Sequence, residues 1–168
     1  MKDHPDDHLA ERFEAMSDRD KIDLMIETNG WALEAIQPDA DSAPPTPGYA
    51  YTVGLTADVG FPEVVVFGLT PSASKGLLTL VADACRGGTE IPIGVEVVGL
   101  LDNELRCLFA PVDLGPWGPY FASATAWYAG RPFEVVQLMY PDRNGFMPYE
   151  PGYEQRMVLA QPVIGTVD

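Results

Sequence analysis

Residues 49–72 read YAYTVGLTADVGFPEVVVFGLTPS, two apolar runs joined by a short turn that contains glycine. In the first eight residues, bulky side chains alternate with small or hydroxyl-bearing ones, which is the period of two of a β-strand. Residues 63–69 are almost wholly β-branched, aromatic or aliphatic, which favours a buried strand. The pattern predicts a hairpin with its turn at residues 57–62, then a helix over about 71–86.

Further elements are predicted on both sides of this hairpin. They are a helix over 18–29 capped by Ser17, a strand over 31–37, a proline-rich loop over 38–48, a second hairpin over 93–101 and 104–112, an aromatic helix that opens near Pro119, a strand over 132–140, and a short helix near 153–160. Because hairpins dominate this order, we expect an α+β fold: a single layered domain with a mainly antiparallel sheet, packed by two to four helices. Residues 17–168 would form this domain and residues 1–16 a flexible acidic lead.

The chain is strongly acidic. It has 25 Asp and Glu against 10 Lys and Arg among 168 residues, a net charge of −15. Residues 1–41 carry twelve acids and four bases, about half of that charge. Such a charge repels nucleic-acid phosphates and anionic membranes, so we expect neither as a partner, whereas a basic protein would be attracted.

The sequence also bears on location and assembly. The first residues are acidic and lack the apolar stretch of a secretory signal, and no apolar run is long enough to span a bilayer. Cys85 and Cys107 lack the spacing of metal ligands and are interpreted as reduced thiols. These features predict a cytoplasmic protein. The sequence does not determine the oligomeric state, and a homodimer is one of the alternatives.

Four blocks together resemble a known family. They are YTVGLT, PEVVVFGL with the proline-opened helix after it, QLMYPDRNGFMPYEPGY, and a late QP. In this order they are similar to the bacterial family called domain of unknown function 4262, over roughly residues 20–163. The resemblance implies a compact cytosolic domain and no established activity. Family members often have GHPEL where this chain has GFPEV, so Phe61 replaces the expected histidine, and FPWE where residues 147–150 read MPYE.

Polar residues of two distant segments are the main candidates for a site. If the last strand lies beside the first hairpin, they would converge at one end of the sheet and bind a ligand. A buried Glu63 would need backbone donors or an arginine, and Arg143 is the preferred partner. The alternative is that these residues only shape turns and satisfy backbone groups. The candidates are Tyr51, Thr52, Thr56, Glu63, Gln137, Asp142, Arg143, Tyr149 and Glu150.

The sequence contains few residues that could form a cofactor site. With histidine confined to His4 and His8 and no metal-binding motif, no metal and no resident cofactor are predicted. By analogy with flavin-binding split barrels, FMN is an alternative, with its phosphate near the start of the helix. The residues on that phosphate side would be Thr70, Ser72, Ser74 and Lys75. The aromatic residues near 117–128 could line a pocket, but their helical spacing favours a core.

Three functions remain open. The acidity and the lack of a complete catalytic set favour a binding or interaction module over an enzyme; an immunity-like protein that neutralises a basic partner is one version. The second hypothesis is a flavin- or nucleotide-like small-molecule site. The third is a hydrolase or transferase that pairs Glu63 with Asp142 or Glu150, which requires carboxylates roughly 5–9 Å apart.

Overall fold

The computed structural model describes residues 16–168, so the predicted acidic lead lies outside the described residues except for Met16. The described strands are β1 (Ala32–Ile36), β2 (Tyr49–Val53), β3 (Glu63–Phe67), β4 (Glu96–Val97), β5 (Cys107–Pro111) and β6 (Val135–Met139). The α-helices are α2 (Asp18–Asn29), α3 (Leu55–Val59), α4 (Pro71–Arg86), α5 (Leu114–Trp117) and α6 (Ala122–Tyr128). Short 3₁₀ turns span Asp102–Glu104, Gly118–Phe121 and Gln155–Met157.

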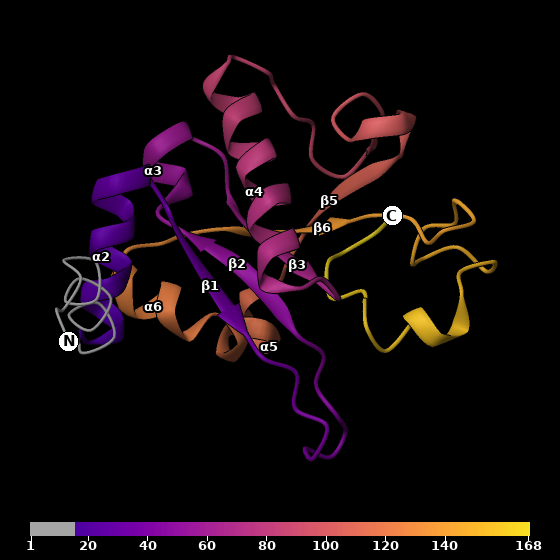
Figure 1. The fold of residues 1–168 in the computed structure, drawn as a ribbon, viewed down its shortest axis with the longest axis horizontal. Coiled ribbons are helices and arrows are strands. Elements are labelled where there is room, and N and C mark those ends of the chain that lie inside the picture. Colours follow the sequence, from indigo (N-terminus) through magenta and orange to yellow (C-terminus); the bar gives the residue numbers. More distant parts are fainter. Residues whose placement is uncertain (1–15) are drawn as a thin grey trace, which may run out of the picture.

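The six strands form one open sheet in the order β1-β2-β3-β6-β5-β4 (Figure 1). Four of the five neighbouring pairs are antiparallel, and β3 and β6 are parallel, with Glu63 opposite Val135. The prediction of an α+β fold with a mainly antiparallel sheet is therefore confirmed. The sheet has free edges at β1 and β4, so it lacks the barrel closure on which the flavin analogy was built.

Both faces of the sheet are covered. On one face Leu78 and Val81 of α4 pack with Val64 and Val66 of β3. On the other face Phe121 and Tyr128 pack with Val65 of β3 and with α2. A strand buried on both faces reads as a continuous apolar run, which explains EVVVF. The aromatic residues of 117–128 belong to or pack against this second cluster, as their spacing predicts for a core.

The helix ends follow the predicted caps. Ser17 accepts a hydrogen bond from the Asp20 N–H, and Gly30 ends α2 in the left-handed conformation. The Thr70 hydroxyl accepts from the Ala73 N–H at the start of α4. The capping residues thus mark where α2 begins and ends and where α4 begins.

Four predicted elements differ from the structure. Two are shorter than expected: β4 covers only Glu96–Val97 of the strand predicted over 93–101, and a 3₁₀ turn at Gln155–Met157 replaces the helix predicted near 153–160. The segment expected to be a plain turn, residues 57–62, instead overlaps α3, because Gly54 and Gly60 both adopt positive φ and let the chain enter and leave one helical turn. The aromatic helix is interrupted: a 3₁₀ turn holds Pro119, which cannot donate a helix hydrogen bond, and α6 begins after it.

Candidate functional site

Glu63 is fully buried at the start of β3. Its carboxylate accepts hydrogen bonds from the Thr52 hydroxyl at 2.7 Å and the Leu55 N–H at 3.0 Å. It also lies within hydrogen-bonding distance of the Thr56 N–H and hydroxyl and of the Tyr128 hydroxyl. Because a carboxylate offers about four lone-pair positions, these donors leave it no free acceptor for a ligand. Burial and the contact with Glu63 raise the pKa of Tyr128 above its ordinary value.

The predicted pairing of Glu63 with Arg143 is wrong. Arg143 is exposed and forms an ion pair with Glu154 at 3.4 Å. Hydroxyl and backbone N–H groups, and not an arginine, stabilise the Glu63 carboxylate. Backbone donors were the alternative to an arginine that the sequence left open for a buried Glu63. Glu63 therefore ties together β2, α3, β3 and α6.

The two candidate segments do not converge, although the last strand does lie beside the hairpin. Since β6 runs parallel to β3, Val135 lies beside Glu63 and the chain then moves away from it. Four residues of strand take the end of β6 about 13 Å from Glu63, and Asp142 and Glu150 come later still. Glu150 contacts Arg106, just before β5, at that far end. The separation contradicts the paired-carboxylate hypothesis.

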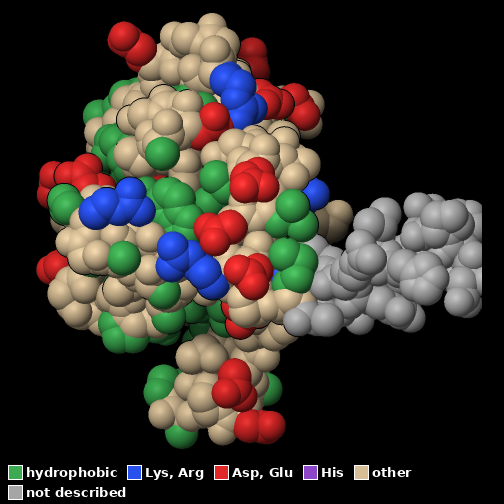
Figure 2. All heavy atoms as spheres, turned by 90° about the vertical axis from the view of Figure 1, so that its left-hand side faces the viewer, with side chains coloured by type: hydrophobic (Ala, Val, Ile, Leu, Met, Phe, Trp, Pro, Cys, Tyr) green, Lys and Arg blue, Asp and Glu red, His purple; other side chains and the backbone are tan. Residues whose placement is uncertain are grey.

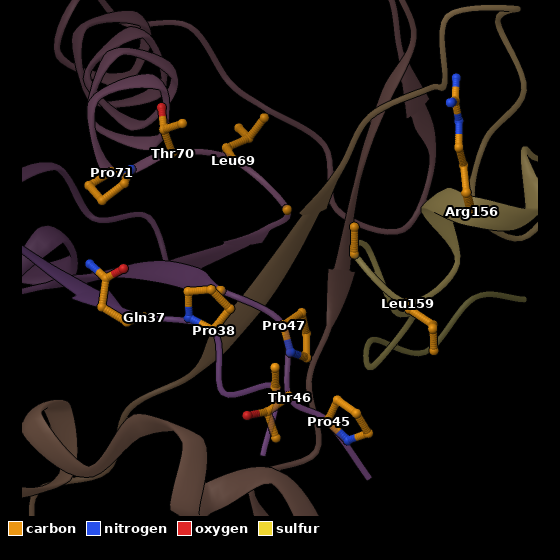
Figure 3. A pocket seen from close by; sticks show the side chains of 14 residues that line it. Gln37, Pro38, Pro45, Thr46, Pro47, Leu69, Thr70, Pro71, Arg156 and Leu159 are labelled. Atoms are coloured by element: carbon orange, nitrogen blue, oxygen red, sulfur yellow. The ribbon is translucent and has the colours of Figure 1, made fainter. Parts of the chain in front are cut away.

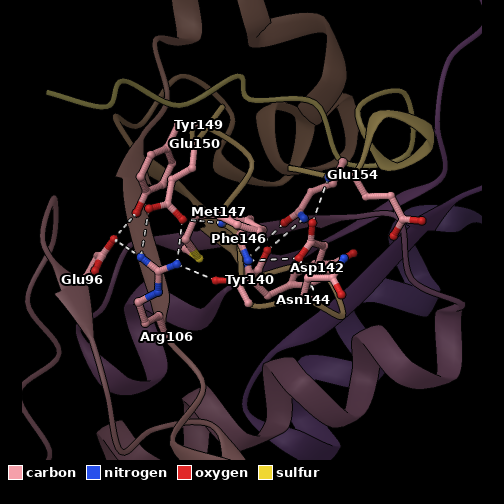
Figure 4. Close-up of polar contacts among 12 residues, drawn as sticks. Glu96, Arg106, Tyr140, Asp142, Asn144, Phe146, Met147, Tyr149, Glu150 and Glu154 are labelled. Carbon is pink, nitrogen blue, oxygen red and sulfur yellow. Dashed lines mark hydrogen bonds and ion pairs between the residues drawn. The ribbon is translucent and has the colours of Figure 1, made fainter. Parts of the chain in front are cut away.

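At the far end, Arg106 holds the loop after β6 against the edge of the sheet (Figure 4). Its guanidinium donates to Glu150 at 2.6 Å and to Glu96 of β4 at 3.0 Å, and Tyr149 donates to Glu96 at 2.7 Å. The hydrogen bond from Arg106, together with one from the Met147 N–H, lowers the pKa of Glu150. Burial raises the pKa of Tyr149, and the contact with Glu96 raises it further.

Asp142 organises the same loop from within (Figure 4). Its carboxylate accepts from the N–H groups of Asn144, Phe146 and Glu154 at 2.8–3.0 Å. Burial opposes ionisation, but these hydrogen bonds outweigh it and lower the pKa of Asp142. This is the turn-shaping role that the sequence left open for Asp142.

Tyr51 and Gln137 lie in the middle of the sheet, one on each side of Val65. The Tyr51 hydroxyl accepts from the Ser123 N–H. Gln137 accepts from the N–H groups of Ile164 and Gly165 and donates to the Pro162 carbonyl at 2.6 Å, so it fastens the C-terminal segment to the sheet. Both side chains are buried and bonded within the protein.

The four phosphate-side candidates do not form one site. Thr70 caps α4, while the buried Ser74 hydroxyl has no hydrogen-bond partner among the described residues. Lys75 lines a different depression from the one beside Thr70. Thr52 lies at the Glu63 end of the sheet, whereas Thr70 and Ser72 follow the opposite end of β3, so they could not hold one ligand group together.

A groove lies where the parallel strands β3 and β6 end (Figure 3). We call it the proline groove; its volume is about 600 Å³. Figure 3 shows Pro38 and Pro47 across from Leu159, with Leu69 and Thr70 above. Gly68 at its base must be glycine, because φ is +82° and a Cβ would come within 2.9 Å of the Tyr140 hydroxyl. The lining residues are Gln37, Pro38, Ala40, Pro45, Thr46, Pro47, Gly48, Gly68, Leu69, Thr70, Pro71, Arg156, Leu159 and Ala160.

A second hollow lies between α4 and the segment that leads through β4 at the free edge of the sheet. We call it the β4 hollow; its volume is also about 600 Å³. Its lining includes Leu80 and Val98, which are large apolar side chains exposed to solvent. The lining contains two acids and no base: Leu80, Asp83, Ala84, Thr89, Glu90, Ile91, Pro92, Val97, Val98, Gly99 and Leu100.

Residues 16–168 contain neither a metal-binding cluster nor a helix suited to a membrane. No group of three or more His, Cys, Asp or Glu side chains there could hold a metal ion. None of the helices in that part is long and apolar enough to cross a bilayer. Cys85 and Cys107 are free, and burial raises the pKa of Cys107 to about 11, so this thiol is unreactive at neutral pH.

Sequence reasoning missed both hollows. Residues 38–48 are predicted as a rigid loop, and their prolines are the one visible sign of a preformed wall. The segment IGVEVVGLL, residues 93–101, is assigned to a hairpin strand, yet only Glu96 and Val97 of it pair with β5. In this part of the sequence, apolar residues are interspersed with acids. That pattern is the signal from which an exposed surface at the edge of the sheet could have been predicted.

Comparison with known proteins identifies one family. A family model described as "Domain of unknown function (DUF4262)" matches residues 25–154. No curated protein and no solved structure matches the chain significantly. The blocks on which the resemblance rested supply the Thr52, Leu55 and Thr56 contacts of Glu63, the glycine that lines the proline groove and the Asp142 loop.

Proposed function

Because the chain belongs to the DUF4262 family, a family of domains of unknown function, we propose from its own geometry that it is a binding module that docks a basic protein at the β4 hollow. An immunity-like role, in which an acidic cytoplasmic domain of a bacterium neutralises a cationic protein, fits this proposal. The observation that carries it is an exposed apolar hollow with acids and no base in its lining.

The centre of this surface is apolar. Val98 is 60% exposed and Leu80 is 38% exposed, although both are hydrophobic. Exposed apolar side chains gathered at a hollow with a polar rim are typical of protein interaction sites. The folded chain leaves these two side chains exposed to solvent. A partner that buried them would therefore gain binding free energy.

The rim is acidic. Between residues 87 and 105 the chain has Glu90, Glu96, Asp102 and Glu104 and no Lys or Arg. The next base, Arg106, is already bonded to Glu96 and Glu150. On the face that holds α2, by contrast, Figure 2 shows acids interspersed with Lys and Arg. Because Asp83 is paired with Arg86 and Glu96 with Arg106, the charge that favours a cationic partner and speeds its approach lies on Glu90, Asp102 and Glu104.

The sheet edge suggests how the partner binds. β4 is an edge strand of two residues, so an extended segment could hydrogen bond along it. Its apolar side chains would enter the hollow while Lys or Arg side chains meet the rim. The sequestered Glu63 and its distance from Asp142 and Glu150 support this binding role over carboxylate catalysis.

The test uses two labelled probe peptides, one alternating Lys with Val and one alternating Glu with Val, followed by fluorescence anisotropy. The Lys–Val peptide should bind, more weakly as salt is raised, and the Glu–Val peptide should not. Glu90→Lys should weaken binding roughly fivefold, because a partly exposed charge pair contributes about 1 kcal/mol.

Glu27→Lys is the matched control, since it changes the net charge equally on an exposed site of α2. It should leave the affinity within about twofold. Equal loss in both variants, or equal binding of both peptides, would show that only net charge matters and would contradict the proposal.

A second candidate is the small-molecule hypothesis, which the proline groove favours. Of its fourteen lining residues only Arg156 is charged, and Arg156 is already paired with Glu154. The volume lies in the range of small-molecule sites, so an uncharged, mostly apolar ligand would fit. Leu159→Glu should weaken binding of the neutral dye Nile red, whereas Leu24→Glu on α2 should not; equal effects would remove this candidate.

A further inference from the structure

We propose that a third depression, between α2, α4 and β1, binds a small organic anion with an apolar body. This Lys75 cleft has a volume of about 600 Å³, within the range of small-molecule sites. It is separate from the proline groove and does not depend on the proposed protein partner. The lining residues are Met25, Asn29, Trp31, Leu33, Lys75, Thr79, Asp83 and Arg86.

Lys75 supplies the charge. Its ammonium group makes no hydrogen bond or ion pair with any other described residue. The other cation of the cleft, Arg86, is bonded to Asp58, to Asp83 at 3.2 Å and to the Asn29 carbonyl. Asp83 is the one acid in the lining and is already paired. Lys75 is therefore the one cation of the lining that is left to pair with a ligand.

The rest of the cleft offers two kinds of contact. Met25, Trp31 and Leu33 give it an apolar floor. Thr79 lies one helical turn after Lys75 on α4, so both side chains point to the same side of the helix. Neither the Thr79 hydroxyl nor the Asn29 amide has a hydrogen-bond partner among the described residues. A cavity that combines three apolar side chains, a few free polar groups and one unpaired cation suits a carboxylate or phosphate ester on an aromatic or aliphatic body.

Protein-observed NMR with a matched pair of probes tests this inference. The probes are 2-naphthoate, an anion, and 2-naphthylmethylamine, a cation of similar shape. Naphthoate should shift the amides of Lys75 and Thr79 and the indole N–H of Trp31. It should bind at least about fivefold more tightly than the amine, as expected of one partly exposed charge contact.

Variants distinguish a site from general adsorption. Lys75→Gln should weaken naphthoate binding about fivefold, and Lys75→Arg should keep it within about twofold because the charge is retained. Arg19→Gln, which removes an exposed cation from α2, should change nothing. Equal affinity for both probes, shifts that fall outside the cleft, no saturable shift up to about 10 mM, or an unchanged affinity in Lys75→Gln would each overturn the inference.

Discussion

At the scale of single residues, Glu63 is held by hydrogen bonds where a cation would be the usual partner. Burying an ionised carboxylate is costly unless donors replace its water shell. Here Thr52, Leu55 and Tyr128 are among the groups that do so, and they come from different elements. The donors are already in position in the folded chain, so Glu63 contributes to the fold and is closed to ligands.

Replacement of Glu63 tests this account. In Glu63→Gln, one acceptor oxygen becomes an NH₂ group that faces donors, so we expect a loss of about 2–4 kcal/mol in the free energy of unfolding. Urea denaturation measures it. The neighbouring Glu134→Gln, on an exposed residue, is the control and should cost less than about 0.5 kcal/mol. Similar values for the two variants would refute the structural role of Glu63.

Two glycines make a second matched pair. Gly68 has φ of +82° and close neighbours, whereas Gly76 lies inside α4 with nothing within 4 Å of the point where a Cβ would stand. Gly68→Ala should destabilise by roughly 1–3 kcal/mol through strain, and Gly76→Ala should stabilise by up to about 1 kcal/mol. Thermal unfolding of the two variants measures both changes in stability. Effects of the same sign would contradict the geometry at the base of the proline groove.

At the scale of elements, the loop after β6 depends on two ionised carboxylates. The pKa values of Asp142 and Glu150 are lowered in the folded state. A carboxyl with a lowered folded pKa adds stability above its unfolded pKa and loses it as pH falls through the folded value. The ordinary values are 3.8 and 4.5, so this stabilisation is present at neutral pH, begins to fall below those values and is lost as pH passes through the lower folded pKa values.

The Asp142→Asn variant should make that dependence visible. Its amide NH₂ would face an N–H group that Asp142 now accepts from, so the variant should melt below wild type at pH 7. The melting temperatures should converge as pH falls below the ordinary pKa of 3.8 and Asp142 of the wild type becomes protonated. Differential scanning calorimetry across this range is the measurement; parallel curves would show that Asp142 does not contribute through its ionised form.

The elements also show what could be predicted from sequence. The strands around Tyr51 and Val65 and the capped helix at Pro71 are confirmed, because period, β-branching and capping are local signals. The direction of β6 relative to β3 is not local. The chain between β3 and β6 is about 70 residues long, so local signals do not fix the direction of β6. That direction alone places Glu63 and Asp142 at opposite ends of the sheet. The candidate site failed at that step, while the turn-shaping role of Asp142 was readable from PDRNG.

At the scale of the whole molecule, the negative charge is distributed unevenly. The net charge of −15 was visible in the composition, and so was a preference for a basic partner. Composition cannot show that acids mix with bases over α2, whereas the lining of the β4 hollow has two acids and no base. That contrast is visible only once the fold is known, and it supports our proposal that a basic partner docks at residues 80–105.

Amide hydrogen–deuterium exchange with and without the Lys–Val peptide tests the docking surface most directly. The account predicts slower exchange on β4 and in residues 89–100, because a segment paired along this edge would cover its backbone N–H groups. Exchange in α2 and β1 should stay unchanged. Protection that falls on α2, or that spreads evenly over the acidic surface, would contradict the proposal that the β4 hollow is the binding site.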